Sequence, residues 1–77
     1  MNTASKHVII TGASRGIGRA SAIACGARGW RVVVNYARDH AAAQDTVRAV
    51  IAAGGEARAV QADVADEAQA RRLFAEA

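Results

Sequence analysis

The sequence has no proline, one cysteine and one residue each of Trp, Tyr and Phe, and each shortage excludes something. Cys25 has no partner for an internal disulfide, which favours a reducing compartment. No apolar stretch approaches the roughly 18 residues of a membrane-spanning helix, and no charged segment followed by an apolar run opens the chain. With so few rings among many alanines, the core must be poor in bulky groups. We therefore expect a cytoplasmic protein without a membrane partner.

The size and charge of the chain limit its class further. Its 77 residues allow at most one small domain, and 52% hydrophobic with 22% charged residues is a globular composition. The net charge of +3 raises nucleic acid as a partner, but the arginines form no contiguous run and no stripe interleaved with aromatic residues. His7 and His40 have no partner at metal-ligand spacing. We expect no nucleic-acid partner and no metal, although a small anion held by a few arginines fits.

Strand and helix patterns alternate along the whole chain. Continuous apolar residues such as Val32-Val33-Val34 predict strands that are covered on both faces. Glycines at 29 and 54 stand where helices end, and Asp66 with Gln69 three residues later predicts the start of the last helix. Strands are expected at about 6–11, 31–35 and 57–62, and helices at about 17–28, 39–53 and 66–77. This order predicts an α/β fold, the first half (βαβαβα) of a doubly wound Rossmann-type parallel sheet.

The glycine-rich run TGASRGIG, residues 11–18, is the most informative segment. It follows the apolar residues Val8-Ile9-Ile10 and opens a helix of small residues. Glycine lets the backbone turn sharply and lets a ligand approach closely, and a helix N-terminus offers unpaired N–H groups to an anion. Ser21 stands where the general dinucleotide fingerprint has a third glycine or alanine. The position between strand and helix favours a phosphate-binding turn over a tight turn that binds nothing.

The end of the second strand predicts which nicotinamide cofactor the chain takes. An acidic residue about 20 residues beyond the glycines would accept hydrogen bonds from a ribose 2′-hydroxyl. This chain instead has NYAR at 35–38, with no carboxylate before Asp39. An arginine pairs with a 2′-phosphate through two hydrogen bonds, so Arg15 and Arg38 are the expected clamp. NADP is favoured over NAD; Asp39 leaves NAD open, and Arg38 as a solvated loop residue is the alternative.

Asp63 and Val64 follow the third strand, at the sheet edge where parallel strands present their carboxyl ends to a ligand. An aspartate there can accept a hydrogen bond from an adenine amino group, while a nearby backbone N–H meets a ring nitrogen. The alternative is that Asp63 only caps the turn into the next helix. The pair therefore predicts an adenine contact.

The first strand predicts an incomplete domain. In the usual doubly wound order it lies at the centre of the sheet, with strands two and three on one side. The chain has no fourth strand for the other side, and an apolar strand left as an edge invites aggregation. Residues 1–77 are therefore expected to be the N-terminal part of a single NAD(P)-binding Rossmann domain, truncated within the third helix. The remainder of the same domain is the expected partner.

Together these segments resemble the short-chain dehydrogenase/reductase family. The resemblance rests on TGASRGIG after a strand, VVVNYAR at strand two, GGEA, and ADV at strand three, and it covers essentially the whole chain. It is closest to the bacterial branch that holds ketoacyl-carrier-protein reductases and glucose-dehydrogenase-like enzymes. The family implies an NADP(H)-dependent oxidoreductase that acts on a small-molecule carbonyl or alcohol and is a homo-tetramer when full length.

The resemblance also implies a role for each site residue. Gly12, Gly16 and Gly18 form the turn around the pyrophosphate. Ser14, Arg15 and Ile17 contact the ribose, phosphate and nicotinamide side. Asn35, Tyr36, Ala37 and Arg38 surround the adenosine ribose or its phosphate, and Asp63 and Val64 hold the adenine.

The catalytic residues that the resemblance implies are not found in this sequence. Family members use a tyrosine four residues before a lysine, helped by a serine and an asparagine. Here the only tyrosine, Tyr36, is followed four residues later by His40, and Lys6 is the only lysine. No catalytic residue is therefore expected in the chain. An NADP-binding module without catalysis, or an inactive truncated fragment, is the alternative to the oxidoreductase.

Overall fold

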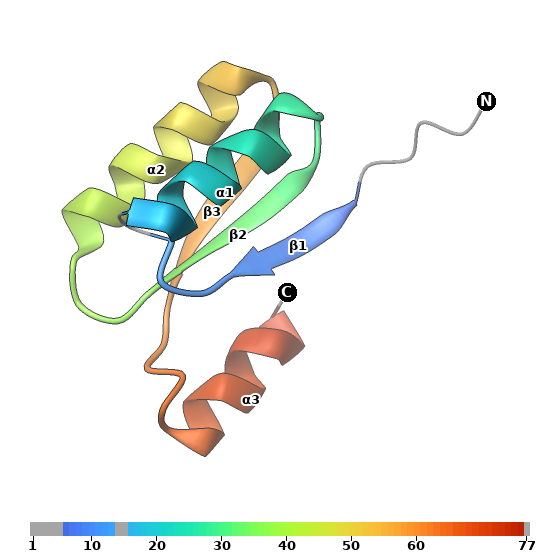
Figure 1. Cartoon of the computed structure of the whole chain (residues 1–77). Coiled ribbons are helices and arrows are strands. Elements are labelled where there is room, and N and C mark those ends of the chain that lie inside the picture. Colours follow the sequence, from blue (N-terminus) through green and yellow to red (C-terminus); the bar gives the residue numbers. More distant parts are fainter. Residues whose placement is uncertain (1–5, 14–15, 77) are drawn as a thin grey trace.

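The alternation expected from the sequence is present in the computed structural model, which describes residues 6–13 and 16–76. Among these residues three strands and three helices follow one another (Figure 1). They are β1 (His7–Ile10), α1 (Gly16–Ala27), β2 (Arg31–Tyr36), α2 (His40–Ala53), β3 (Glu56–Gln61) and α3 (Glu67–Glu76). Each bound differs from the expected one by no more than one residue, which is within the usual uncertainty of a helix or strand end.

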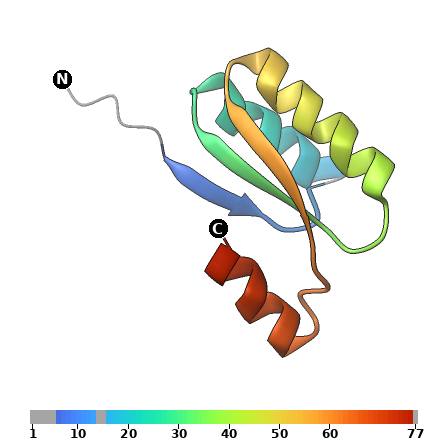
Figure 2. The ribbon, with the colours of Figure 1, turned by 180° about the vertical axis from the view of Figure 1, so that it is seen from behind.

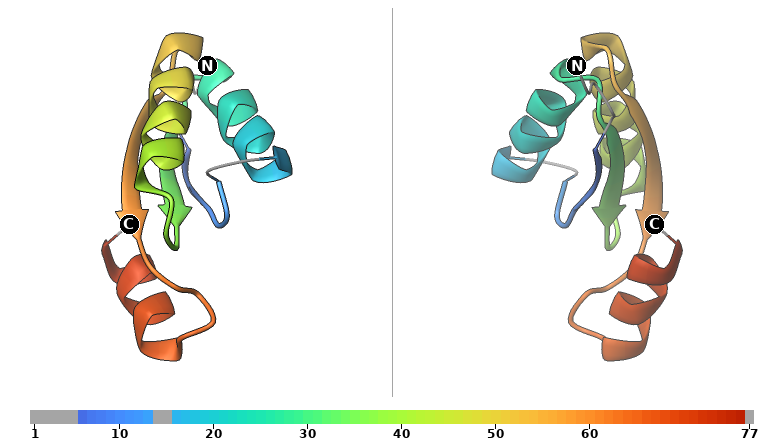
Figure 3. Two further views of the ribbon diagram at one scale, coloured as in Figure 1. Left: turned by 90° about the vertical axis from the view of Figure 1, so that its left-hand side faces the viewer. Right: turned by 90° about the vertical axis from the view of Figure 1, so that its right-hand side faces the viewer.

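The strands form one parallel sheet in the order β1-β2-β3. Val8 pairs with Val32 across β1 and β2, and Asn35 pairs with Val60 across β2 and β3. α1 and α2 lie together on one face of the sheet, as the side views show (Figure 3). This is the βαβαβα arrangement expected from the sequence, with the second and third strands on the same side of the first.

The core between the sheet and this helix pair is built from small and β-branched side chains. Val32 and Val34 of β2 pack there with Ala22 of α1 and with Val47 and Val50 of α2, and all of them are buried. Side chains of this size leave little distance between the elements that carry them. The scarcity of bulky groups in the sequence therefore appears in the structure as closely spaced helices.

α1 and α2 approach each other closely at Gly26. A Cβ atom there would stand 2.7 Å from Cγ1 and 2.8 Å from the carbonyl oxygen of Val50. Gly55, in the turn after α2, meets the same point of α1, because its Cβ would stand 2.6 Å from Cα of Gly26. Cβ atoms do not come so close to other heavy atoms, so only glycine fits at both positions without moving the helices.

The opposite face of the sheet is covered only in part. Val33 points to it and packs with Ile9, Val60 and Leu73, and the Leu73 side chain is fully buried. α3 carries Leu73 and lies at the carboxyl-end side of the sheet, so that much of this face is bare in the rear view (Figure 2). Within the described residues β1 pairs only with β2, so its outer edge presents unpaired backbone groups.

Burial along the chain confirms one expectation and corrects another. Val32, Val33 and Val34 are all buried, so β2 is covered on both faces as its apolar run predicts. The sequence spacing of Val47, Val50 and Ile51 predicts that all three lie on one buried face of α2. Ile51 is instead 54% exposed, because it follows Val50 by one residue and so lies about 100° further round the helix. No helix among the described residues combines the length and apolarity needed to cross a membrane.

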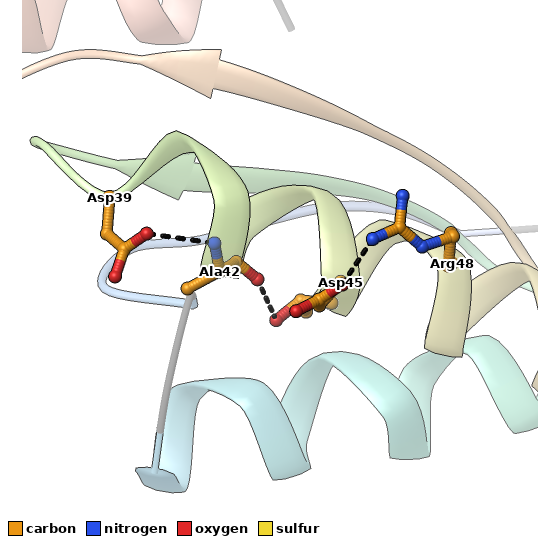
Figure 4. A network of polar contacts seen from close by, with 5 residues as sticks. Asp39, Ala42, Asp45 and Arg48 are labelled. Atoms are coloured by element: carbon orange, nitrogen blue, oxygen red, sulfur yellow. Dashed lines mark hydrogen bonds and ion pairs between the residues drawn. The ribbon is translucent and has the colours of Figure 1, made fainter.

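The start of α2 is held by a network of polar contacts (Figure 4). Oδ1 of Asp39 accepts a hydrogen bond from the backbone N–H of Ala42 (2.9 Å), which makes Asp39 the N-cap of the helix. One turn further, the hydroxyl of Thr46 donates to the carbonyl of Ala42 (3.2 Å), and Arg48 pairs with Asp45 on the exposed side. The Asp39 carboxylate is therefore engaged by the helix that it begins.

The start of α3 confirms the predicted cap and modifies its partner. Oδ1 of Asp66 accepts hydrogen bonds from the N–H groups of Ala68 (2.9 Å) and Gln69 (3.2 Å). In a capping box the Gln69 side chain would accept a hydrogen bond from the backbone N–H of Asp66. Instead its amide nitrogen donates to the Asp66 carboxylate (3.4 Å) and its oxygen accepts from the N–H of Asp63 (2.8 Å). Gln69 thus ties the cap to the end of the third strand.

Candidate functional site

Hydrogen bonds tie the carboxyl ends of the three described strands together. The N–H of Ala13, in the glycine turn after β1, donates to the carbonyl of Asn35 (3.1 Å), and the N–H of Ala62, after β3, donates to the carbonyl of Tyr36 (2.9 Å). The side-chain amide of Gln61 adds a bond to the carbonyl of Ala37 (2.9 Å). The three segments that the sequence analysis singled out therefore lie beside one another at one edge of the sheet.

The glycine turn runs from the end of β1 into α1. Gly12 and Gly16 have φ angles of 62° and 59°, in the left-handed region that residues with a Cβ rarely adopt. A Cβ atom built at either position would meet no heavy atom within 4 Å. The backbone at these two glycines is therefore open on that side, where a ligand can approach it closely.

Gly18, in the first turn of α1, is needed for a different reason. A Cβ atom there would stand 2.4 Å from the carbonyl oxygen of Gly12 and 3.1 Å from Cα of Ala13, so the helix rests directly on the turn. The first N–H groups of a helix have no partner within it and carry the positive end of its dipole. Open backbone beside such a helix end fits the diphosphate of a dinucleotide.

Of the other predicted residues of this loop, the structure describes Ile17 but not Ser14 and Arg15. Ile17, also in the first turn of α1, is 88% exposed, and an isoleucine so exposed offers an apolar surface beside the turn. Ser14 and Arg15, which were expected to contact the ribose and phosphate, lie outside the described residues. The expected cofactor contacts of these residues stay predictions.

The turn between β2 and α2 carries the two charges that bear on the choice between NADP and NAD. Arg38 is exposed, as is its neighbour Ala37, and Tyr36 is half-buried at the end of β2. The half-buried Asp39 directs its carboxylate to the N–H of Ala42 as the helix cap. The guanidinium is thus presented at the surface, while the carboxylate is turned to the helix.

The side chain of Asn35 takes a structural position that the sequence did not indicate. It is 2% exposed, and its Nδ2 donates to the carbonyls of Val60 (3.3 Å) and Ala62 (3.0 Å). The amide therefore joins the carboxyl ends of β2 and β3, beside the turn that carries the other predicted ribose contacts. A contact between Asn35 and the ribose stays a prediction, whereas its role in holding the two strand ends is a feature of the structure.

Asp63 and Val64 lie on the surface just after β3. Oδ1 of Asp63 accepts a hydrogen bond from the N–H of Ala65 (3.0 Å), so the turn-capping role considered as an alternative is present. Val64 is 44% exposed and adds apolar surface at the same edge. Their predicted contact with the adenine is compatible with this placement and stays a prediction.

His40 takes part in this edge through a contact that was not predicted from the sequence. It is exposed, but its Nδ1 lies 2.8 Å from the hydroxyl oxygen of Tyr36. The signal for this contact was the separation of four residues between Tyr36 and His40. That spacing was considered only as a departure from a catalytic motif, because the contact depends on how the turn returns His40 towards the end of β2.

A hollow of about 230 Å³ lies at the other end of the sheet. It opens on the bare face described above, and its lining residues are His7, Arg31, Val32, Val33, Glu56, Ala57 and Arg58. The glycine turn and the start of α2 are at the opposite, carboxyl ends of the strands, where parallel α/β sheets bind ligands. Within residues 6–13 and 16–76, no group of three His, Cys, Asp or Glu side chains is placed to hold a metal ion.

Comparisons with known proteins agree with this geometry. The model of the family described as short chain dehydrogenase matches residues 6–77. The 3-oxoacyl-[acyl-carrier-protein] reductase of Synechocystis is 54% identical over 66 residues, which is 86% of this chain and 27% of that protein. Versicolorin reductase 1 of Aspergillus parasiticus is 49% identical over 71 residues, which is 92% of this chain and 27% of that protein.

A solved structure matches the fold as well. The reductase LugOII, which catalyses keto-reduction at C1 during lugdunomycin biosynthesis, superposes with a TM-score of 0.85 and 38% identity over 96% of this chain and 29% of its own. The chain thus spans about a quarter of the length of the curated relatives that it matches. The segment that it shares with them includes the glycine turn and the ends of all three described strands.

Proposed function

The chain belongs to the short-chain dehydrogenase family, and from this premise we propose that it forms the cofactor-binding part of an NADP(H)-dependent oxidoreductase. The proposed reaction transfers a hydride between the nicotinamide and a small-molecule substrate, reducing a carbonyl group or oxidising an alcohol. The names of the relatives support a carbonyl substrate, since they denote reductases of a 3-oxoacyl carrier protein and of versicolorin, and a keto-reduction.

The observation that carries the proposal is the geometry of the glycine turn. Gly12 and Gly16 adopt left-handed φ angles and are open on the side where a Cβ would stand. Gly18 brings the start of α1 directly onto the turn. Backbone N–H groups at a helix start, beside glycines that carry no side chain, are suited to bind the two phosphates of a dinucleotide.

The proposed preference for NADP rests on the turn after β2. The exposed Arg38 can form two hydrogen bonds to a 2′-phosphate, together with Arg15 of the glycine turn. The neighbouring carboxylate, of Asp39, accepts a hydrogen bond from the N–H of Ala42 and is directed towards the helix. This arrangement favours a phosphate over a hydroxyl at the 2′ position.

We expect Arg38→Ala to weaken NADP binding by about 10- to 100-fold, because hydrogen bonds to a charged group contribute about 1.5 to 3 kcal/mol. NAD, which has no 2′-phosphate, should lose less than about threefold. Titration calorimetry of the full-length protein with both nucleotides measures the two changes. Arg48→Ala is the matched control, since Arg48 is an exposed arginine of α2 whose partner is Asp45 (Figure 4). Equal losses for NADP and NAD would contradict the preference.

The bare parts of the sheet support a further component of the proposal. The outer edge of β1 and much of the face that α3 leaves open need a partner, and we propose that the remainder of the same domain supplies it. The catalytic tyrosine and lysine of the family would lie in that remainder. The full-length protein is proposed to be a cytoplasmic homo-tetramer.

The activity itself is tested on the full-length product of the reading frame. We expect it to oxidise NADPH in the presence of at least one member of a panel of ketones, with a lower rate when NADH replaces NADPH. Loss of NADPH absorbance over time measures the reaction. Complete inactivity on the panel together with intact NADP binding would favour an NADP-binding module without catalysis.

A further inference from the structure

Tyr36 and His40 form a contact that spans the turn after β2. The hydroxyl oxygen of Tyr36 lies 2.8 Å from Nδ1 of His40, and the rings meet edge to face with centroids 5.5 Å apart and planes at 61°. Tyr36 is half-buried against the core beneath α1 and α2, while His40 is exposed as the first residue of α2. An anchored ring is thus hydrogen-bonded to an exposed one.

The contact lies at the same edge as the glycine turn. The N–H of Ala13 bonds to the carbonyl of Asn35, one residue before Tyr36 (3.1 Å), and the N–H of His40 bonds to the carbonyl of Arg38 (3.1 Å). The hydroxyl of Tyr36, the guanidinium of Arg38 and the imidazole of His40 therefore lie within five residues, in one short turn and at its two ends. The proposed function gives Arg38 to the 2′-phosphate, but it leaves the imidazole without a role.

We propose that His40 is a positioning residue for cofactor discrimination: through Nδ1 it orients the hydroxyl of Tyr36 so that the pair favours a 2′-phosphate over a 2′-hydroxyl. This inference rests on the proposed function. Either tautomer of the imidazole can bond to Tyr36, because Nδ1 can accept from the hydroxyl or donate to it. When Nδ1–H donates, the hydroxyl proton of Tyr36 is left to point elsewhere.

The two nucleotides differ in how much they depend on that orientation. A phosphate dianion has only acceptors, so it binds more tightly when the hydroxyl of Tyr36 donates to it. This orientation of the hydroxyl is stabilised when Nδ1–H of the imidazole donates to the hydroxyl oxygen. A ribose hydroxyl can donate or accept, so it can bond to Tyr36 in either orientation. Removal of the imidazole should therefore affect NADP more than NAD.

A double-mutant cycle on the full-length protein tests the inference. We expect His40→Ala to weaken NADP binding by about 3- to 10-fold, the range of one neutral hydrogen bond, with NAD changed by less than about twofold. Tyr36→Phe removes a hydrogen bond to either nucleotide, so we expect it to weaken NADP binding by about 10- to 100-fold, through the charged 2′-phosphate, and NAD binding by about 3- to 10-fold. The double variant should bind NADP no more weakly than the weaker single variant, since the two side chains act as one unit. Titration calorimetry with NADP and with NAD gives all the dissociation constants.

A conservative variant separates positioning from a structural role. His40→Asn keeps a hydrogen-bonding atom at the δ position, as Nδ1 is, and should restore the ratio of the NADP and NAD dissociation constants to within about twofold of the wild-type value. His7→Ala is the control, because His7 is the other histidine of the chain and lies at the opposite end of the sheet, at the start of β1.

The possible results divide between the two proposals. If the wild-type protein binds neither nucleotide, the proposed function itself fails. If the wild type binds NADP but His40→Ala leaves the ratio of the two dissociation constants unchanged, the function stands and the inference about His40 is overturned. Equal weakening of NADP and NAD binding by His40→Ala, or additive losses of NADP binding in the double variant, would overturn it as well.

Discussion

Gly18→Val is expected to lower the affinity for NADP by about 100-fold, the largest effect on binding that the structure predicts for one substitution. The added Cβ would stand 2.4 Å from the carbonyl oxygen of Gly12 and 3.0 Å from its carbon, both backbone atoms that cannot rotate away. α1 must therefore withdraw from the turn and take its first N–H groups with it. Equilibrium titration of the full-length protein with NADP measures the loss.

Gly29→Ala is the matched control for this substitution. Gly29 follows the other end of α1 with a φ of 78°, but a Cβ there would meet no heavy atom within 4 Å. We expect a loss of stability of about 1 kcal/mol from the left-handed backbone and unchanged NADP affinity. If Gly18→Val bound NADP within threefold of the wild type, NADP binding would not depend on the close contact between α1 and the turn.

Asn35→Asp is expected to lower the free energy of unfolding by about 3 to 5 kcal/mol at neutral pH, although the two side chains have nearly the same shape. Nδ2 of Asn35 donates to the carbonyls of Val60 and Ala62, and the substitution would place an acceptor where that donor stands. A buried carboxylate against two carbonyl oxygens has no compensating partner there. Urea unfolding of the full-length protein gives the difference from the wild type.

The same substitution has a characteristic pH dependence. Burial and the facing carbonyls raise the folded-state pKa of the introduced carboxyl above its unfolded value of about 3.9. The loss of stability is therefore small below about pH 4, grows as the pH rises through the interval between the unfolded and folded pKa, and is constant above it. A loss that did not change with pH would show that charge is not its cause.

Gln61→Glu supplies the control for Asn35→Asp. It makes the same change from amide to acid at a side chain that also donates to a backbone carbonyl, that of Ala37 at 2.9 Å. Gln61 is exposed, however, so water can solvate the new charge. We expect a loss below about 1 kcal/mol. A loss as large as that of Asn35→Asp would mean that the burial of Asn35 is not decisive.

The fold could be predicted from the sequence because its signals are local and repeat along the chain. The apolar run at 32–34 predicted a strand covered on both faces, and all of its side chains are buried. Asp66 predicted the start of α3, and Gly54 the end of α2, where it adopts a φ of 114°. Each depends on a few neighbouring residues, so no knowledge of the tertiary structure was needed.

The parts that escaped prediction depend on how distant segments meet. Asn35 reaches Val60 and Ala62 only because β2 and β3 pair in one particular register. His40 reaches Tyr36 only because the intervening turn folds back. Ile51 is exposed because α2 presents its neighbour Val50 to α1. Position along the chain indicated which residues gather at the carboxyl ends of the strands, but not which of them bond to one another.

The tight contact between Gly26 and Val50 connects the two ends of α1. α1 is a helix of 12 residues, about 18 Å long, with the Val50 contact near its last turn and the glycine turn at its first. A methyl group at Gly26 would push the last turn of α1 away from Val50. Because the helix moves as a rigid body, its first turn, where the phosphates are proposed to bind, would be displaced as well. Gly26, although distant from the proposed nucleotide site, is therefore as intolerant of enlargement as Gly18, and affinity can be lost there without a contact to the ligand.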